Sequence, residues 1–480
     1  MSLINKTATG IGWSLLDKIV SQVVTFLLFI YLSKNLSPSA FGLVAMLAVF
    51  LAVAQSVIDS GFSQALIQKS NKVTVEDLST VFYVNLLLSC LIYAVLYVSA
   101  PMIAHFFNQP DLILLSRVLF SIVIVNAIAI VPRTKFIIEI DFKTQSIINT
   151  ISTVFSSVVT VYMVINEFGY WSLVGMSLSK ALCSSILLII LSRWIPKAIF
   201  SYSSLKSLFS FGSNLLIAGL ISTFVQNLYT ILIGRYFNSS QVGFFHQGYT
   251  YTNVISTTMT SVIQGVTYPI MTSIQEDNKR LTRIYIRLMG VVSMLSFPIF
   301  VGFAAVAEEF VLLFLGDNWK PMIPVLVILS FARLITPISS LNLNILNAKG
   351  RSDLFLKVDV IKIPMIIGFL FLAIPYGIVG VAFAQLSAVI ISFFINAYYP
   401  GKLFGFGAKE QLRQIIPIAF AAMTMYFFVS LIEIDNTLLQ LTLKVILGVV
   451  VYVSLCLMLK INAFIDVFTL VKSRFNKVSL

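Results

Sequence analysis

The sequence predicts an all-α polytopic membrane protein of about fourteen transmembrane helices. Three observations lead to this fold class: 58% of the 480 residues are hydrophobic, only 11% are charged, and the mean hydropathy is +0.97. Globular chains carry roughly 25% charged residues, so a lipid bilayer must solvate most of this one. The apolar runs are continuous rather than alternating, which favours spanning helices over a β-barrel.

Each predicted span is an apolar segment of about 20 residues or more, the length that a bilayer requires. The segments lie near 11–32, 41–62, 79–104, 112–131, 147–166, 171–192, 211–234, 242–272, 284–306, 322–346, 354–374, 378–399, 414–432 and 438–459. The segment at 242–272 is the most polar of them, because it is rich in Thr, Ser, Asn and Gln.

The distribution of basic residues predicts the orientation. Of the 32 Lys and Arg residues, only Lys34, Arg235 and Lys320 fall in loops on the side opposite the termini, and six lie within spans. The others gather on the side of the termini, so the positive-inside rule places both termini in the cytoplasm. The net charge of +13 therefore reflects topology, and we expect no nucleic-acid partner.

A short motif occurs twice along the chain. LSPSAFG at 36–42 follows the first predicted span, and FNSSQVG at 237–243 follows the seventh. Because six spans separate the copies, both halves have the same orientation, as in transporters built from parallel repeats. We expect two parallel six-helix lobes around a central cavity, with two further helices at the C-terminal end.

These patterns divide the chain into four predicted parts. They are an N-terminal lobe at 1–195 (spans 1–6), an amphipathic cytoplasmic linker at 196–210, a C-terminal lobe at 211–400 (spans 7–12), and spans 13 and 14 with a cytoplasmic tail at 401–480. In the linker, Ile199, Tyr202 and Leu205 recur at helical spacing, and the tail at 461–477 has a similar pattern. Both segments suit amphipathic helices that lie on the cytoplasmic leaflet.

Six cations lie within predicted spans, where each costs about 2.5–3.5 kcal/mol at the bilayer centre. They are Lys18, Arg117, Lys180, Arg333, Lys362 and Lys444. Lys180 and Arg333 lie near mid-span, so they predict a cationic, water-filled cavity; interhelical ion pairs are the alternative. Arg117 is equally compatible with snorkelling to the outer surface, and Lys362 with pairing to Asp359, three residues before it.

Three charged residues are expected to have ordinary structural surroundings. Lys444 lies at a depth from which a lysine side chain usually reaches the membrane surface. Glu308 and Glu309 form an adjacent acidic pair near the outer face, where a solvated turn is expected.

Uncharged polar side chains accompany the cations. The residues that we expect to line the cavity are Gln22, Asn253, Thr257, Gln264 and Asn344. Such stripes also hold helices together through hydrogen bonds, so helix–helix packing is the alternative role for these residues. A polar, net-positive cavity predicts an anionic guest that bears phosphate and hydroxyl groups.

Signals of catalysis are missing from the sequence. Its only histidines are His105 and His246, and its three cysteines lie in apolar runs without metal-ligand spacing. There is no P-loop. We therefore expect neither an enzyme nor a cofactor or metal site.

Several segments resemble one known family. They are Gly12-Trp13-Ser14, LSPSAFGLVAM (36–46), DSGFSQALIQ (59–68), STVFYVN (79–85), APMIAHFF (100–107), GYWSLV (169–174), LFSFG (208–212), ILIGR (231–235) and NAKGRSDLFLK (347–357). Together they resemble the Wzx-type polysaccharide flippases of the polysaccharide transporter family, within the multidrug/oligosaccharidyl-lipid/polysaccharide (MOP) exporter superfamily. The last hundred residues match in hydropathy only.

The resemblance implies export of undecaprenyl-diphosphate-linked oligosaccharide repeat units across the bacterial inner membrane, for O-antigen, capsule or exopolysaccharide. It implies alternating access driven by an H⁺ or Na⁺ gradient, with the diphosphate held by cations. The candidates are Lys18, Lys180, Arg333, Lys362 and Arg117. A polysaccharide polymerase and a chain-length regulator are the implied partners. The protein itself is expected to be a monomer.

Ion coupling is the least determined part of this prediction. Asp17, Asp59 and Asp359 are the candidate acids. The family often carries an Asp after the Asn-Leu of span seven, where this chain has Tyr229.

Two other functions stay open. A drug or cation extruder of the same superfamily would need a cavity dominated by acids. A membrane polymerase or glycosyltransferase would need a large extracytoplasmic loop or an acid catalyst.

Overall fold

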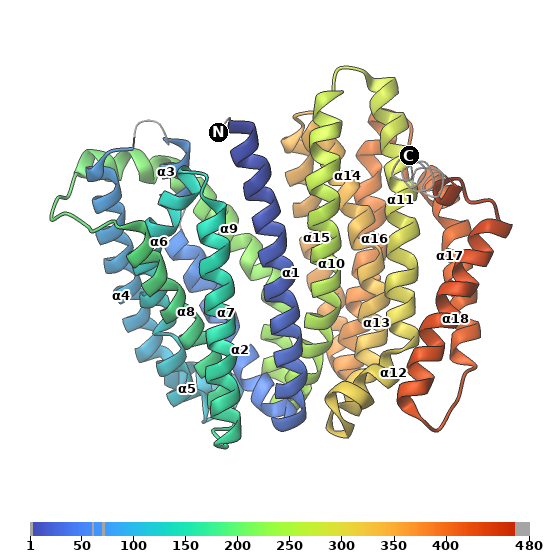
Figure 1. Ribbon diagram of the computed structural model, residues 1–480, viewed down its shortest axis with the longest axis horizontal. Coiled ribbons are helices and arrows are strands. Elements are labelled where there is room, and N and C mark those ends of the chain that lie inside the picture. The colour runs from blue at the N-terminus through green and yellow to red at the C-terminus, as the bar shows by residue number, and fades with distance from the viewer. Residues whose placement is uncertain (1–2, 60–61, 70–72, 466–480) are drawn as a thin grey trace, which may run out of the picture. The chain divides into compact units, whose positions relative to one another are not determined.

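The computed structural model describes residues 3–59, 62–69 and 73–465, and these residues form helices joined by short connections (Figure 1). By internal contacts the chain divides into two compact units, Met1–Gly243 and Phe244–Leu480. Each unit is described by itself below.

The N-terminal unit contains nine helices within the described residues, the last of which ends at Tyr236, and the first turn of a tenth. The nine are α1 (Leu3–Asn35), α2 (Pro38–Asp59), α3 (Phe62–Gln68), α4 (Val75–Phe107), α5 (Leu112–Leu119), α6 (Ile122–Ile138), α7 (Phe142–Ile165), α8 (Trp171–Ser192) and α9 (Tyr202–Tyr236). Caps fix several ends: Thr74 and Asp77 form a capping box at the start of α4, and the Asp141 carboxylate accepts the backbone N–H of Thr144 at the start of α7.

The C-terminal unit contains the remaining helices. They are α10 (Ser239–Ser273), which begins in the first unit, α11 (Asn278–Ala305), α12 (Ala307–Phe310), a π-helical turn η2 (Val311–Leu315), a 3₁₀ turn η3 (Asp317–Met322), α13 (Ile323–Leu334), α14 (Thr336–Ala348), α15 (Ser352–Ala373), a 3₁₀ turn η4 (Ile374–Tyr376), α16 (Gly377–Phe404), α17 (Ala408–Ser430) and α18 (Thr437–Met458).

The helices confirm an all-helical, multi-span membrane protein. Within the described residues, 11 stretches are long and apolar enough to cross a membrane. One of them, 353–404, is 52 residues long and contains both α15 and α16. The 35-residue helices α9 and α10 coincide with the predicted spans seven and eight but are not among these stretches. Fourteen crossings therefore stay a prediction.

Two predicted spans are each split into two helices. The segment at 112–131 breaks between α5 and α6 at Phe120 and Ser121, and the segment at 322–346 breaks between α13 and α14 at Ile335. Pro337, in the first turn of α14, has no N–H to continue a helix from α13. Each pair of helices still forms one stretch long and apolar enough to cross a membrane, 112–138 and 317–348, as predicted, but the sequence did not predict the breaks.

The linker differs from a separate amphipathic helix. Residues 197–201 are not helical, and Ser201 caps α9, whose first turns lie across one end of the N-terminal unit (Figure 1). Leu208 is buried in a cluster with Phe62 and Val131, so this part of the apolar face packs on protein. Most of the predicted tail helix at 461–477 lies outside the described residues. The four predicted parts stay a prediction.

The two copies of the repeated motif touch within the N-terminal unit. A Cβ added at Gly42 would lie 1.8 Å from the carbonyl oxygen of Ser239, and one added at Gly243 would lie 1.9 Å from that of Pro38. Real Cβ atoms do not approach an oxygen so closely. The glycine that ends each copy is therefore required by the reciprocal crossing of α2 and α10.

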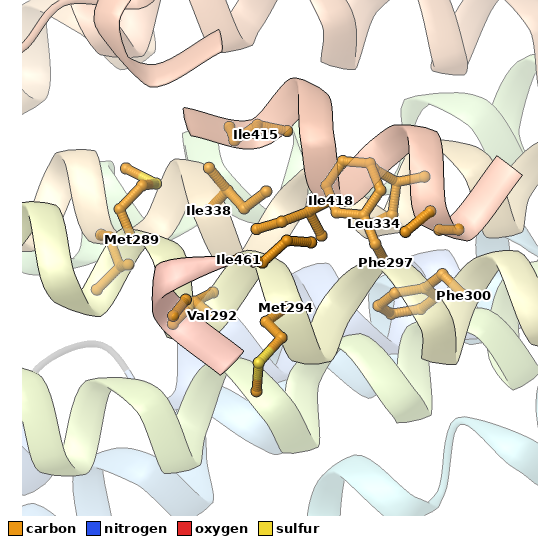
Figure 2. Packing of buried hydrophobic residues seen from close by; sticks show 14 of the residues in the cluster. Met289, Val292, Met294, Phe297, Phe300, Leu334, Ile338, Ile415, Ile418 and Ile461 are labelled. Atoms are coloured by element: carbon orange, nitrogen blue, oxygen red, sulfur yellow. The ribbon is translucent and has the colours of Figure 1, made fainter. Parts of the chain in front are cut away.

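The C-terminal unit is built on a core along α11. Met289, Val292 and Phe300 of this helix pack with side chains of α13, α14 and α17 (Figure 2). In lipid such contacts stabilise through close packing and interhelical hydrogen bonds rather than through the hydrophobic effect. The main polar element here is a closed triangle of Tyr285, Asn342 and Gln411, in which every member bonds the other two.

Candidate functional site

Asp17 is the centre of a polar cluster between α1 and α7. Its carboxylate accepts hydrogen bonds from the Asn149 amide (3.0 Å to both oxygens), the Thr150 hydroxyl (2.9 Å) and the Ser21 hydroxyl (3.0 Å). All these donors are neutral, so none of them carries a charge that balances that of a carboxylate. Lys180 of α8 lies within electrostatic range of Asp17.

A cavity of about 320 Å³ adjoins this cluster. Asp17, Asn149 and Ser184 line it together with Arg133 from the end of α6. Carboxylate, amide and hydroxyl oxygens in one small cavity are the ligand types of a hard cation, and a carboxylate is also a proton acceptor. Among the described residues, no group of three or more His, Cys, Asp and Glu could hold a metal ion.

On the same helix as Asp17, the Lys18 side chain is exposed and that of Gln22 is half-buried. Of the predicted site residues, the structure thus brings Asp17 and Lys180 near each other.

Arg333 lies in the last turn of α13, directly before the break at Ile335. Its guanidinium carbon is 4.4 Å from the centre of the Tyr249 ring of α10. Its Nε and Nη2 are buried, and no described residue is a hydrogen-bond partner of either nitrogen. A buried guanidinium with unsatisfied N–H groups is costly, and it has the donor geometry that binds phosphate oxygens.

Arg117 repeats this arrangement in the N-terminal unit. It lies in the last turn of α5, shortly before the break at Phe120, and its guanidinium carbon is 4.5 Å from the centre of the Tyr97 ring. Its Nε is also buried without a partner. The fourth span of each half is therefore broken after an arginine that stacks on a tyrosine, which the sequence alone did not predict.

Lys362 is paired locally. Its Nζ lies 2.6 Å from the Asp359 carboxylate on the same helix and donates to the Asn396 amide oxygen of α16 at 3.2 Å. The pairing interpretation of Lys362 is thus confirmed. The Asp359 carboxylate is engaged as well, which weakens it as an ion-coupling group.

The predicted polar stripe divides into two groups. Thr257 and Gln264 are exposed and Asn253 is half-buried on α10. Asn344 is buried, and its amide donates to the Thr267 hydroxyl at 3.3 Å, so it joins α14 to α10. The Asp59 side chain lies outside the described residues.

The expectations for Lys444 and Glu309 were wrong. The Lys444 ammonium pairs with the Glu309 carboxylate at 2.5 Å, and their side chains are only 8% and 3% exposed. Glu309 therefore lies inside the unit and not in a solvated turn, and Lys444 does not reach the surface. Gln440 also donates to Glu309, at 2.7 Å.

Comparisons with known proteins agree on one kind of protein. Residues 31–324 match a family described as "Polysaccharide biosynthesis protein". Teichuronic acid biosynthesis protein TuaB of Bacillus subtilis (strain 168) is 24% identical, over 96% of this chain and 97% of its own. Lipopolysaccharide biosynthesis protein WzxC of Escherichia coli (strain K12) is 25% identical, over 82% and 79%.

A solved structure, "Lipid II flippase MurJ, inward closed conformation", has the same fold. The match has a TM-score of 0.76 and covers 94% of this chain and 98% of that chain. Sequence identity is 13%, so the likeness concerns the fold alone.

Proposed function

Because this chain belongs to the polysaccharide biosynthesis protein family, whose members are membrane transporters and not enzymes, we propose that it is a flippase for a lipid-linked oligosaccharide. The substrate class is an undecaprenyl-diphosphate-linked repeat unit for a surface polysaccharide: O-antigen, capsule or exopolysaccharide. The protein would work in a bacterial inner membrane, with fourteen crossings and both termini in the cytoplasm.

The observation that carries the proposal is the state of Arg333. Two of its nitrogens are buried without an acceptor, and a tyrosine ring covers its guanidinium. A diphosphate supplies acceptor oxygens for such donors and compensates the charge. Lys180, Lys18 and Arg117 are the further cations of the proposed site; Lys362 contributes less because Asp359 already neutralises it.

The glycan would contact polar side chains that stay accessible. Gln22, Asn253, Thr257 and Gln264 are half-buried or exposed, and their amides and hydroxyls suit sugar hydroxyl groups. Asn344 leaves this set because it bonds Thr267.

Asp17 is the best-supported candidate for ion coupling to an H⁺ or Na⁺ gradient. Neutral donors hold its carboxylate beside a small polar cavity. Binding of a proton or Na⁺ there would change the charge near Lys180, and a ligand that interacts differently with two states shifts their populations. Asp359 and Asp59 are weaker candidates. A polysaccharide polymerase and a chain-length regulator remain the proposed partners of a monomeric transporter with two alternating lobes.

Deletion and complementation test the proposal. Without the gene, lipid-linked repeat units should accumulate on the cytoplasmic leaflet while surface polysaccharide is lost, and the intact gene should reverse both effects. Normal surface polysaccharide with altered drug sensitivity would instead support a drug or cation extruder and contradict the proposal.

A further inference from the structure

A second cavity, of about 780 Å³, lies in the C-terminal unit away from the residues discussed so far. Its walls are the first half of α11, the first half of α17 and the chain that follows α18, residues 459–463. Lys460 has a φ of 49°, a left-handed turn that directs the chain back toward α11. There Ala463 packs so closely on Gly290 that a Cβ on the glycine would lie 3.0 Å from the alanine Cβ.

Four cations from three segments converge on this cavity. Arg283 and Arg287 are four residues apart on α11, Arg413 lies on α17, and Lys460 follows α18. Glu410 is the one carboxylate among the lining residues, and its Oε2 accepts the backbone N–H of Gly407 at 3.0 Å. Among the described residues that line the cavity, basic side chains therefore outnumber acidic ones by four to one.

Apolar side chains line the same cavity. They include Ile286, Pro417 and Ile418. Gln414 donates to the backbone carbonyl of Ile286 at 2.9 Å, which fixes its side chain at the wall. A lining that combines basic and apolar side chains matches a lipid, whose phosphate adjoins an apolar body.

The general cationic bias of this side of the membrane does not explain the convergence. Lys279, Arg280 and Lys409 lie in the first turns of the same two helices and do not line the cavity, although they are as exposed as Arg283 and Arg413. Charge that served topology alone would need no common cavity. Arg283 and Arg413 instead face one space from different helices.

We propose that this cavity binds the phosphate head group of a membrane lipid in the cytoplasmic leaflet, an assignment of leaflet that rests on the proposed orientation of the chain. Guanidinium groups bind phosphate oxygens through paired N–H donors. Basic pockets between helices on the cytoplasmic side are typical sites for anionic head groups. The volume exceeds the needs of inorganic phosphate, and the apolar side chains of the lining accommodate the start of a lipid tail.

The test measures binding to the purified full chain in detergent, by titration calorimetry. The probes are dioctanoyl phosphatidylglycerol, farnesyl diphosphate as a short polyprenyl diphosphate, and inorganic phosphate. The test variant is Arg283→Gln/Arg413→Gln, and the matched control is Arg280→Gln/Lys409→Gln, which removes one charge from each of the same helices. One basic residue near an anionic head group is worth about fivefold in affinity, so two should cost about thirtyfold.

The expected result is a lipid affinity that falls about thirtyfold in the test variant, is unchanged in the control, and largely returns in Arg283→Lys/Arg413→Lys. Tighter binding of phosphatidylglycerol would identify a phospholipid as the occupant, and tighter binding of farnesyl diphosphate the transported lipid. The proposal would be overturned if the test variant and the control variant bound the lipids with equal affinity. It would also be overturned if inorganic phosphate bound as tightly as the lipids.

A second variant guards against misfolding of the first. Lys460→Asn removes one cation while tolerating the left-handed backbone at this position, and it should weaken lipid binding about fivefold. Binding in detergent is independent of orientation and of transport. Failure here would therefore leave the flippase proposal untouched, and failure of complementation would leave this site untouched.

Discussion

The two units each hold a carboxylate between helices, and they hold it in opposite ways. In the N-terminal unit Asp17 accepts hydrogen bonds from neutral donors, Asn149 and Thr150 of α7, and Lys180 lies within electrostatic range of it. In the C-terminal unit Glu309 is bound by the Lys444 ammonium at 2.5 Å. The Asp17 cluster adjoins a cavity of about 320 Å³, whereas the Glu309 side chain is 3% exposed.

This difference sets a charge that is compensated inside the protein apart from one that neutral groups hold. A buried ion pair cancels its own charge, and neither partner can change its state without leaving the other uncompensated. A carboxylate held by amide and hydroxyl donors can bind a proton or cation while its neighbours stay in place. Glu309 and Lys444 therefore join α18 to the unit, and under the proposed function Asp17 is the group that responds to an ion gradient.

The largest expected effect comes from breaking the structural pair. Lys444→Met leaves the Glu309 carboxylate buried with only the Gln440 amide as a partner, which should destabilise the protein by about 3–5 kcal/mol. The amount of protein in the membrane and its thermal unfolding in detergent measure this effect.

The double variant Glu309→Gln/Lys444→Met is the matched control. It removes both charges and keeps an oxygen that accepts from Gln440, so most of the stability should return. If the single variant were as stable as the wild type, the pair would not have the structural role assigned to it.

Asp17→Asn should destabilise the protein less than Lys444→Met does. Its main effect should be on ion coupling. The amide oxygen still accepts from Thr150 and Ser21, so the cost should be about 1–3 kcal/mol. Export, measured at matched protein abundance, should lose its dependence on the ion gradient. Asp359→Asn should keep that dependence; a loss of equal size in both variants would move the coupling site away from Asp17.

The smallest expected effect concerns the aromatic partner of Arg333. Tyr249→Leu removes the ring beneath the guanidinium, which is worth about 0.5–2 kcal/mol, while Tyr249→Phe keeps it. Export at limiting expression should fall several-fold in the leucine variant only. Equal export by both variants would show that the stacking does not orient Arg333.

Much of this fold could be predicted because the signals are local. Each predicted span is an apolar run that coincides with a helix or a pair of helices. The Lys362–Asp359 pair could also be predicted, since its members are three residues apart on one helix. The breaks between α5 and α6 and between α13 and α14 could not be predicted. A proline is tolerated within a spanning helix, and Phe120-Ser121 has no residue that excludes a helix.

Contacts between distant segments could not be predicted. Glu309 and Lys444 are 135 residues apart, and nothing in their own surroundings pairs them. Asn149 and Thr150 were visible as polar residues in an apolar span, but that pattern does not say that Asp17 faces them. Polar residues in a membrane need partners, and which partner each finds depends on helix packing.

The most direct test of the flippase proposal is export by Arg333→Ala in a deletion strain, compared with Arg351→Ala, a loop arginine paired with the exposed Asp353. At equal membrane abundance, Arg333→Ala should lose surface polysaccharide and accumulate lipid-linked repeat units on the cytoplasmic leaflet, whereas Arg351→Ala should export normally. Wild-type export by Arg333→Ala would contradict the assignment of the diphosphate to this cation.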